Sequence, residues 1–464
     1  MGNKWATVSI DDIKLPEKYS CVGGPFGSSL SQKHYVDSGV PVIRGTNLAG
    51  DIFSESDFVF VSPDKANELQ RNMAFRGDIV FTQRGTLGQV ALIPEDSLYE
   101  KYIVSQSQMK LTVNPKQADA YFIYTYFRTN EAKALIENNA IIGGVPHINL
   151  GILKEFKLRL PPLSEQKRIS EVSKSIDNKI NLNRQINQTL EQISQTLFKS
   201  WFVDFDPVID NALDAGNSIP EALQSRAELR QKVRNSTDFK PLPADIRALF
   251  PAEFEETELG WIPKNWHIRD FSDIAVLIKN NIKSDDICDD IHYIGLEHLE
   301  RKHIFITSYG NGSDVSSNKS AFNKGDLLFG KLRPYFHKVA ITPFSGICST
   351  DILVFRAKEK FYKSLMAMYA FTDEFVAYAN LRSTGTRMPR AEAKDLLKYK
   401  IILPNKNILE KFELLLEDYW AKGQLNNNEN EQLTALRDTL LPKLISGELS
   451  LEDLPDLVTQ TEPA

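Results

Sequence analysis

Side chains of the types that can hydrogen bond to phosphates and base edges cluster around glycine-rich turns in the first third of the chain. Arginine and lysine read guanine, asparagine and glutamine read adenine, and hydroxyl and loop backbone N–H groups bind phosphate. The candidates lie in the loop GGPFGSSLSQKHY, in the turn TQRGTLGQ and beside them: Ser28, Lys33, Arg44, Asn47, Gln83, Arg84, Thr86, Gln106 and His147.

A second group of such side chains occurs in the last third of the chain. The turn FGKLRPYFHK and the loop LRSTGTRMPR combine basic residues with glycine, serine, threonine and aromatic residues. The candidates here are Lys331, Arg333, Tyr335, His337, Arg382, Thr384, Arg387 and Arg390. The loop from Arg382 to Arg390 is the strongest candidate for contact with nucleic acid, while a solvated surface charge is the alternative for each single residue.

Motifs that would carry out catalysis are missing from the sequence. It contains no Asn/Asp-Pro-Pro-Tyr/Phe motif that would position a flipped adenine, and no glycine-rich loop for S-adenosylmethionine. The segment from Gly325 to Leu332 nearly matches a phosphate-binding loop, but it lacks the Ser/Thr that binds Mg²⁺. His292, His298 and His303 have no Cys or acidic partner at ligand spacing. We therefore expect neither catalytic residues nor a metal site.

Composition and charge fit an ordinary soluble protein of 464 residues. The net charge of −6 arises between residues 203 and 259, which include twelve acidic and six basic residues. In the rest of the chain, acidic and basic residues are equal in number. Cys21, Cys288 and Cys348 are too far apart in sequence to suggest a disulfide framework. Without a signal peptide or a long apolar run, we expect a cytoplasmic protein that does not enter a membrane.

The element that must position these loops is a long amphipathic stretch, residues 164–200. Its apolar residues recur mostly every three or four positions, which predicts a helix with a narrow apolar seam, and Ser164 is a suitable N-cap. About 37 residues would form a rod ~55 Å long. The predicted seam residues are Ile169, Val172, Ile176, Ile180, Leu182, Ile186, Leu190, Ile193 and Leu197.

The same pattern returns 243 residues later, from Asn407 to Leu444. Asn407 takes the N-cap position, with Glu410 as its capping-box partner. The corresponding seam residues are Phe412, Leu415, Tyr419, Leu425, Leu433, Leu436 and Leu440. Matching seams predict an intramolecular coiled coil, and the alternative is two unrelated surface helices.

The globular segments repeat as well, since WATVSIDDI from Trp5 aligns with WHIRDFSDI from Trp266. We predict an α+β fold, in which two mixed α/β recognition domains are separated by two long antiparallel helices and related by an internal pseudo-two-fold repeat. The predicted boundaries are a first domain at 1–160, a first spacer helix at 161–205, an acidic connecting arm at 206–262, a second domain at 263–403, a second spacer helix at 404–447 and an acidic tail at 448–464. The arm is predicted to have limited structure apart from one helix, IPEALQSRAELRQKVRN, at residues 219–235.

Two unlike domains on a rigid spacer suit DNA, whose recognition sites repeat about every 34–36 Å. The chain resembles the specificity (S) subunits of type I restriction–modification systems. The motifs that carry the resemblance are LPPLSEQKRI, its degenerate copy ILPNKNILEKF, LFKSWFVDFDPV, ELGWIPKNW and LLPKLISGEL, and they span essentially the whole chain.

The resemblance implies a non-catalytic subunit in which each domain reads half of an asymmetric bipartite site in double-stranded DNA. It also implies that the helices set the gap between the half-sites and bind two methyltransferase (M) subunits, which methylate adenine N6. Restriction (R) motor subunits would add ATP-dependent cleavage. The subunit itself would bind no cofactor, while its partners would use S-adenosylmethionine, ATP and Mg²⁺. Uncharged polar side chains on the outer face of the first helix predict the docking surface: Gln185, Asn187, Gln188, Gln192 and Gln195.

Two other functions remain open from the sequence. One is a stand-alone bipartite DNA-binding protein, which would bind its target tightly without partners. The other is a coiled-coil scaffold that joins two protein-binding domains and does not bind DNA.

Overall fold

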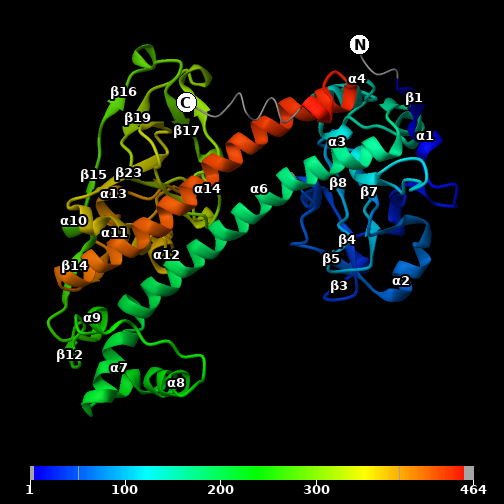
Figure 1. The fold of residues 1–464 in the computed structure, drawn as a ribbon. Coiled ribbons are helices and arrows are strands. Elements are labelled where there is room, and N and C mark those ends of the chain that lie inside the picture. The colour runs from blue at the N-terminus through cyan, green and yellow to red at the C-terminus, as the bar shows by residue number, and fades with distance from the viewer. Residues whose placement is uncertain (1–4, 51, 386, 454–464) are drawn as a thin grey trace. The chain divides into compact units, whose positions relative to one another are not determined.

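The computed structural model describes residues 5–50, 52–385 and 387–453 (Figure 1). The chain forms two compact units: unit 1 contains residues 1–180 and 431–464, and unit 2 contains residues 181–430. Two long helices, α6 (Leu163–Phe198) and α14 (Lys406–Ser446), each contribute residues to both units. Of the predicted acidic tail, residues 454–464 lie outside the described residues.

Unit 1 is built on two sheets and a strand pair. One sheet is antiparallel with the order β2-β10-β7-β8, the other has the order β3-β5-β4-β9-β6 with β4 and β9 parallel, and β1 pairs with β11. The strands are β1 (Ala6–Ser9), β2 (Cys21–Gly23), β3 (Tyr35–Val36), β4 (Val40–Ile43), β5 (Val59–Val61), β6 (Met73–Phe75), β7 (Ile79–Thr82), β8 (Val90–Leu92), β9 (Lys101–Val104), β10 (Gln108–Leu111) and β11 (Lys157–Leu160).

The helices of unit 1 differ in one respect from the sequence prediction. The segment 121–140, predicted as one helix, forms α3 (Ala120–Arg128) and α4 (Asn130–Asn138). Thr129 separates them because its extended backbone ends α3, while its hydroxyl accepts a hydrogen bond from the backbone N–H of Ala132 and caps α4. The short helices are α1 (Ile10–Ile13), α2 (Pro63–Glu68) and α5 (Leu150–Glu155).

Unit 2 repeats this architecture. Its four-stranded sheet has the order β15-β23-β20-β21, β14 pairs with β24, and its five-stranded sheet has the order β16-β19-β22-β17-β18 with β17 and β22 parallel. The strands are β14 (His267–Asp270), β15 (Ala275–Leu277), β16 (Asn281–Ile282), β17 (His292–Ile294), β18 (Gly310–Asn311), β19 (Lys319–Phe322), β20 (Leu327–Gly330), β21 (Val339–Ile341), β22 (Gly346–Cys348), β23 (Ile352–Ala357) and β24 (Lys400–Leu403). The helices outside the arm are α10 (Phe271–Ile274), α11 (Lys363–Ala370), α12 (Asp373–Leu381) and α13 (Ala393–Leu396).

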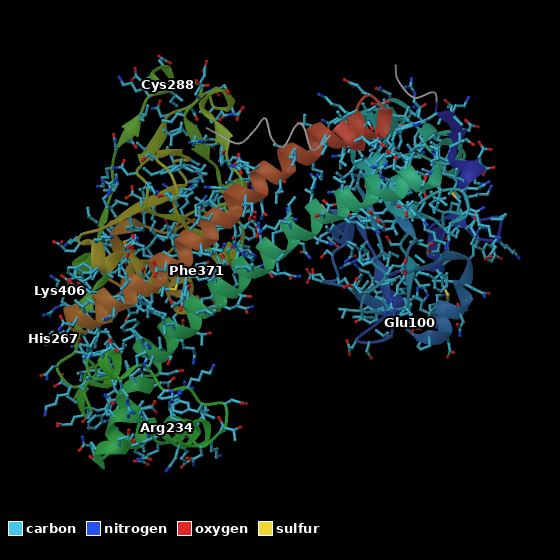
Figure 2. The ribbon with its side chains drawn as sticks, viewed as in Figure 1. Glu100, Arg234, His267, Cys288, Phe371 and Lys406 are labelled. Atoms are coloured by element: carbon cyan, nitrogen blue, oxygen red, sulfur yellow. The ribbon has the colours of Figure 1, made fainter. Side chains whose placement is uncertain are left out.

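The connecting arm contains the helix predicted at residues 219–235, and it has more regular structure around that helix than the sequence indicated. It contains α7 (Asp206–Ala215), α8 (Gln224–Arg234), α9 (Ala244–Arg247) and a hairpin of β12 (Phe254–Thr257) and β13 (Gly260–Pro263). Three Arg–Asp ion pairs, spaced four residues apart on each helix, join α8 to α7: Arg226–Asp206, Arg230–Asp210 and Arg234–Asp214. These pairs engage three of the twelve acidic side chains between residues 203 and 259, an arrangement that the net charge of the sequence did not indicate (Figure 2, where Arg234 is labelled).

The two long helices begin at equivalent positions, Leu163 and Lys406, slightly earlier than the sequence predicted. The predicted N-caps, Ser164 and Asn407, lie inside the helices. Asn405 caps α14 instead, because its side-chain oxygen accepts a hydrogen bond of 3.2 Å from the backbone N–H of Ile408. The capping box with Glu410 is therefore absent.

The apolar seam predicted for the helices is correct only in part. Ile169, Ile176 and Ile180 are buried, but Leu182 is 50% exposed and Ile193 41% exposed. The buried stripe of α6 continues instead through polar residues at regular helical spacing: Asn183, Asn187, Glu191 and Ser194. In α14 the equivalents of the two exposed residues, Leu425 and Leu436, are exposed as well.

Each unit has a large hydrophobic cluster to which both long helices contribute. In unit 1, Phe122 and Phe127 of α3 belong to the same cluster as Ile169 of α6 and Leu441 and Leu444 of α14. In unit 2, Phe198 near the end of α6 and the following residues Trp201 and Phe202 pack with Phe412 and Leu416 of α14. The start of one helix and the end of the other thus pack into the same core.

Candidate nucleic-acid interface

In unit 1, the turn after β7 lies beside the loop that ends at His147. Arg84 and Ile141 each form an isolated antiparallel bridge with His147. The backbone N–H of Gly85 also donates to the carbonyl oxygen of Pro146 at 3.3 Å. Residues 141–147 therefore form a small hairpin, hereafter hairpin A, which is held against the turn that carries Gln83, Arg84 and Thr86.

The glycine loop at residues 23–31 joins the same region through Gln106. The Gln106 side-chain nitrogen donates to the carbonyl oxygens of Gly27 and Leu30, and the neighbouring Ser107 carbonyl accepts from the backbone N–H groups of Gln83 and Arg84. Four segments that the sequence predicted as candidates are thus brought together. Ser28, Lys33, Arg84 and Thr86 are exposed there, whereas the Gln106 amide nitrogen is already used within the protein.

Two predicted contact residues in unit 1 have structural roles instead. Asn47 is fully buried; its side chain accepts a hydrogen bond from the Arg44 backbone and donates to the carbonyls of Ser54 and Ser56. The guanidinium of Arg44 donates to the carbonyl oxygen of Asp57. The prediction that Asn47 reads DNA is therefore wrong, because every polar atom of its amide is turned into the protein.

Unit 2 builds the same pair of loops from different residues. Leu332 and Thr384 each form an isolated bridge with Arg390, and the Arg333 backbone N–H donates to the Pro389 carbonyl at 2.7 Å. The described residues 384–385 and 387–390, hereafter hairpin B, are therefore held against the turn at residues 331–337. His147 and Arg390, the residues that close the two hairpins, are 243 positions apart, as are the long helices.

The basic residues around hairpin B have different environments. Arg390 forms an ion pair with Asp351, with the Nε and Oδ1 atoms 2.8 Å apart. The guanidinium of Arg382 lies 5.4 Å from the ring centroid of Tyr378. Arg387 is exposed, and no ion-pair partner occurs for it among the described residues. Thr384 and Tyr335 are exposed as well, whereas Lys331 and Arg333 are half-buried.

His337 is the second predicted contact residue that the structure places inside the protein. It is 3% exposed; its Nε2 atom lies 2.9 Å from the Phe371 carbonyl oxygen and its Nδ1 atom 3.2 Å from Asp373. Burial lowers the pKa of His337. The prediction that it binds DNA is wrong, because its ring joins the turn to the end of α11.

The predicted docking surface on α6 requires one correction. Gln185, Gln188, Gln192 and Gln195 are exposed, but Asn187 is 7% exposed and faces α14. Its side chain donates to the Gly423 carbonyl and to the Asn427 oxygen and accepts from Asn426, at 2.7–3.1 Å. Sequence reasoning also missed the exposed Leu182, Ile193, Leu425 and Leu436, which it had assigned to the seam. Leu182 and Leu425, like Ile193 and Leu436, occupy equivalent positions in the 243-residue repeat, and this equivalence was the signal in the sequence that could have pointed to a shared surface.

Two stretches of the chain, residues 20–192 and 263–435, match the sequence model of the type I restriction modification DNA specificity domain. Together they make up more than half of the chain, and they are offset by the 243 residues that relate the helices. The chain belongs to this family. The family and the α+β fold class predicted from the sequence are therefore confirmed.

Individual members of the specificity family align over most of the chain. The type I restriction enzyme HindI specificity subunit of Haemophilus influenzae is 27% identical, over 81% of this chain and 87% of its own length. The MjaIX specificity subunit of Methanocaldococcus jannaschii is 24% identical, over 96% and 94%. The crystal structure of the S subunit of a type I restriction–modification system from M. genitalium superposes with a TM-score of 0.50 at 14% identity, covering 96% of both chains, and so has a similar fold.

Other features of this specificity-family chain do not extend the interface. Within the described ranges, no three His, Cys, Asp or Glu side chains are placed to hold a metal ion, and no helix is long and apolar enough to span a membrane. His303, one of the three histidines considered above, lies 2.9 Å from Glu191, which raises its pKa chiefly through this hydrogen bond.

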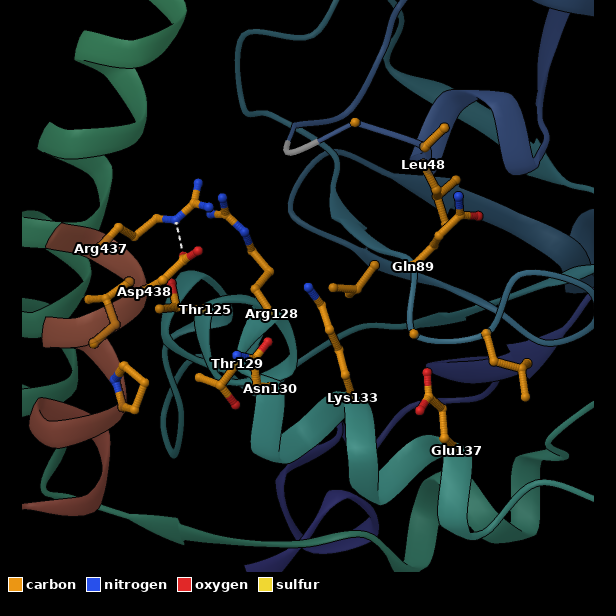
Figure 3. A pocket seen from close by; sticks show the side chains of 17 residues that line it. Leu48, Gln89, Thr125, Arg128, Thr129, Asn130, Lys133, Glu137, Arg437 and Asp438 are labelled. Atoms are coloured by element: carbon orange, nitrogen blue, oxygen red, sulfur yellow. Dashed lines mark hydrogen bonds and ion pairs between the residues drawn. The ribbon is translucent and has the colours of Figure 1, made fainter. Parts of the chain in front are cut away.

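A polar cavity of about 340 Å³ in unit 1 lies between α3, α4 and the end of α14 (Figure 3). Arg128, Lys133 and Arg437 line it, and Arg437 forms an ion pair with Asp438 at 2.9 Å. Arg128 and Arg437 also share the buried Asp177. None of the predicted DNA-contacting residues lines this cavity, although Leu87, Gly88 and Gln89 of the turn TQRGTLGQ do.

Proposed function

We propose that this chain is the non-catalytic DNA-specificity subunit of a cytoplasmic type I restriction–modification complex, and that each domain reads one half of an asymmetric bipartite site in double-stranded DNA. One observation carries the proposal: both units hold a hairpin against a neighbouring turn by the same backbone bridges, yet present different side chains on them. His147 and Arg84 in unit 1 correspond to Arg390 and Leu332 in unit 2. A common frame with different donors suits two unlike half-sites.

The partners would be two methyltransferase subunits bound to the long helices. The exposed amides of α6 and the exposed apolar residues of both helices support this proposal. Leu182 corresponds to Leu425 and Ile193 to Leu436 under the 243-residue repeat, so α6 and α14 offer related surfaces to two copies of one partner. The partners would supply S-adenosylmethionine-dependent methylation of adenine N6, and R subunits would add ATP- and Mg²⁺-dependent restriction.

The helices would also set the number of unread base pairs between the half-sites. Both are long and continuous, with 36 residues in α6 and 41 in α14. A helix transmits position over its length at about 1.5 Å per residue, which makes it a suitable spacer.

The test is to co-express the chain with the methyltransferase encoded beside it and to map methylated adenines across the host genome. We expect one bipartite, asymmetric motif with an unread gap. A complex that forms but methylates no motif would contradict the proposed reading of DNA. If no complex formed and the chain alone bound a bipartite site tightly, the stand-alone DNA-binding function would replace the proposal.

A further inference from the structure

An exposed apolar side chain occupies the same position in both hairpins. Val145 of hairpin A is 53% exposed and Met388 of hairpin B is 47% exposed. Each directly precedes the proline of its hairpin, Pro146 or Pro389, and the two are 243 residues apart. The cationic residues beside them differ between the hairpins, but this apolar position does not.

The backbone around each proline is fixed from two sides. The turn of unit 1 donates a hydrogen bond from Gly85 to the Pro146 carbonyl, and the turn of unit 2 donates one from Arg333 to the Pro389 carbonyl. The bridges to His147 and Arg390 close the hairpins just beyond these prolines. The apolar side chain is therefore presented by a preformed support, where proline also restricts the residue before it.

Other exposed apolar side chains occur on the same hairpin or on the segments next to it. Ile142 is 88% exposed on hairpin A. Next to hairpin B, Leu381 is 80% exposed, and the rings of Tyr335 and Phe336 pack with centroids 4.8 Å apart and are also exposed. Arg382 precedes hairpin B in the sequence, and Arg387 lies within it. A partner that covers such a surface must combine apolar faces with negative charge, and the bases and phosphates of DNA do so.

We infer that Val145 and Met388 are wedge residues, which insert between neighbouring base pairs of the first and second half-site, respectively. The inference rests on the proposed function and extends it. Apolar wedges of this kind partly unstack a base step, and they do so without reading a particular base. This explains why the position is shared by two domains whose polar residues differ.

The experiment uses the assembled complex with its methyltransferase and duplexes that carry the mapped target. A 2-aminopurine, whose fluorescence rises when stacking is lost, replaces one base at a time next to each half-site, away from the target adenine. We expect a several-fold rise in fluorescence at one step in each half-site. Met388→Ser should abolish the rise in the second half-site only, and Val145→Ser in the first half-site only.

A control variant and a measurement of salt dependence complete the experiment. Leu98→Ser removes a 72% exposed apolar side chain from another turn of unit 1 and should leave both signals unchanged. Because serine removes no charge, the salt dependence of binding should stay the same in all variants. If Met388→Ser and Val145→Ser retained both signals, or lost methyltransferase binding instead, the wedge role would be overturned. If the wild-type complex bound DNA weakly and without salt dependence, the proposed function itself would fail.

Discussion

Arg387 and Arg390 are three residues apart but differ in what holds them. Asp351 fixes the guanidinium of Arg390 and neutralises part of its charge, whereas Arg387 is exposed at hairpin B without such a partner among the described residues. An exposed arginine such as Arg387 suits contact with a phosphate, because its side chain can move to meet the DNA backbone and it carries its full charge.

Arg387→Ala should therefore weaken target binding and reduce its salt dependence. Losing one phosphate contact lowers the slope of log K against log salt by about 0.9. Titrations of the assembled complex at several salt concentrations would measure this slope. Lys232→Ala, an exposed cation on α8, is the control and should leave the slope unchanged. Loss of discrimination at one base pair with an unchanged slope would show that Arg387 reads a base instead.

The ion pair between His303 and Glu191 predicts a pH dependence of stability. Glu191 raises the pKa of His303, so the pair stabilises the folded state fully below the unfolded pKa of about 6.5. This contribution is lost as the pH rises through the folded pKa. His303→Gln should cost about 1 kcal/mol or less near pH 6, because the histidine is partly exposed, and less at higher pH. Urea unfolding of both proteins across this range gives the difference, and a difference that does not change with pH would contradict the assignment.

At the scale of the helices, the sequence predicted the existence, the type and almost the full length of α6 and α14. Strong three- and four-residue periodicity and the repeat were sufficient for that. The buried face could not be derived in the same way, because polar residues fill it beyond Ile180. Asn183 and Asn187 form hydrogen bonds with residues of α14. Glu191 accepts hydrogen bonds from the backbone N–H groups of Ile304 and Phe305. These partners are far away in sequence, so local sequence does not reveal them.

Asn187→Ala should destabilise unit 2, since it leaves the amides of Asn426 and Asn427 without their partner. Stranding buried polar groups costs roughly 1–3 kcal/mol. Gln188→Ala, at the next and exposed position, should change the free energy of unfolding by no more than about 0.5 kcal/mol. Denaturation of the two variants under one set of conditions compares them directly. If both variants changed the free energy of unfolding equally, Asn187 would be assigned to the outer surface, as the sequence predicted.

The proposed docking of partners can be tested at the paired apolar positions. Ile193→Asp on α6 and Leu436→Asp on α14 place a charge on each related surface, so each should remove one methyltransferase subunit from the complex. The double variant should lose both. Native mass spectrometry counts the subunits, and Leu229→Asp on α8 serves as an exposed apolar control. Two subunits retained in the double variant would exclude this surface.

The candidate interface was predicted less completely than the helices. The turns and glycine loops could be located from composition, and the structure brings Arg84 and His147 together as neighbours. Burial could not be read from residue type, which is why Asn47 and His337 were wrong. Both are polar residues next to glycine-rich turns, and their hydrogen bonds to the protein depend on the folded loops.

For the whole molecule, each unit has its own large hydrophobic cluster, so damage to one core should remain largely within that unit. Trp201→Ala in unit 2 and Phe127→Ala in unit 1 each remove a side chain that is at most 1% exposed and should cost about 3–5 kcal/mol. Hydrogen exchange would locate the effect. We expect faster amide exchange in residues 181–430 for the first variant and in residues 5–180 and 431–453 for the second. Uniform acceleration throughout the chain would show a single cooperative unit.

The composition of unit 1 has a consequence for synthesis on the ribosome. Its core includes Leu441, Leu444 and Ile445, so the first 180 residues emerge long before the segment that completes their core. At typical translation rates of about 5–20 residues per second, the delay is roughly 10–50 s. During this interval the nascent chain exposes the apolar surface that Leu441, Leu444 and Ile445 of α14 cover in the folded chain, and a chaperone or an early-binding partner would protect it from aggregation. A chain that stops short of α14 would leave that surface exposed permanently, which makes truncated products targets for proteolysis.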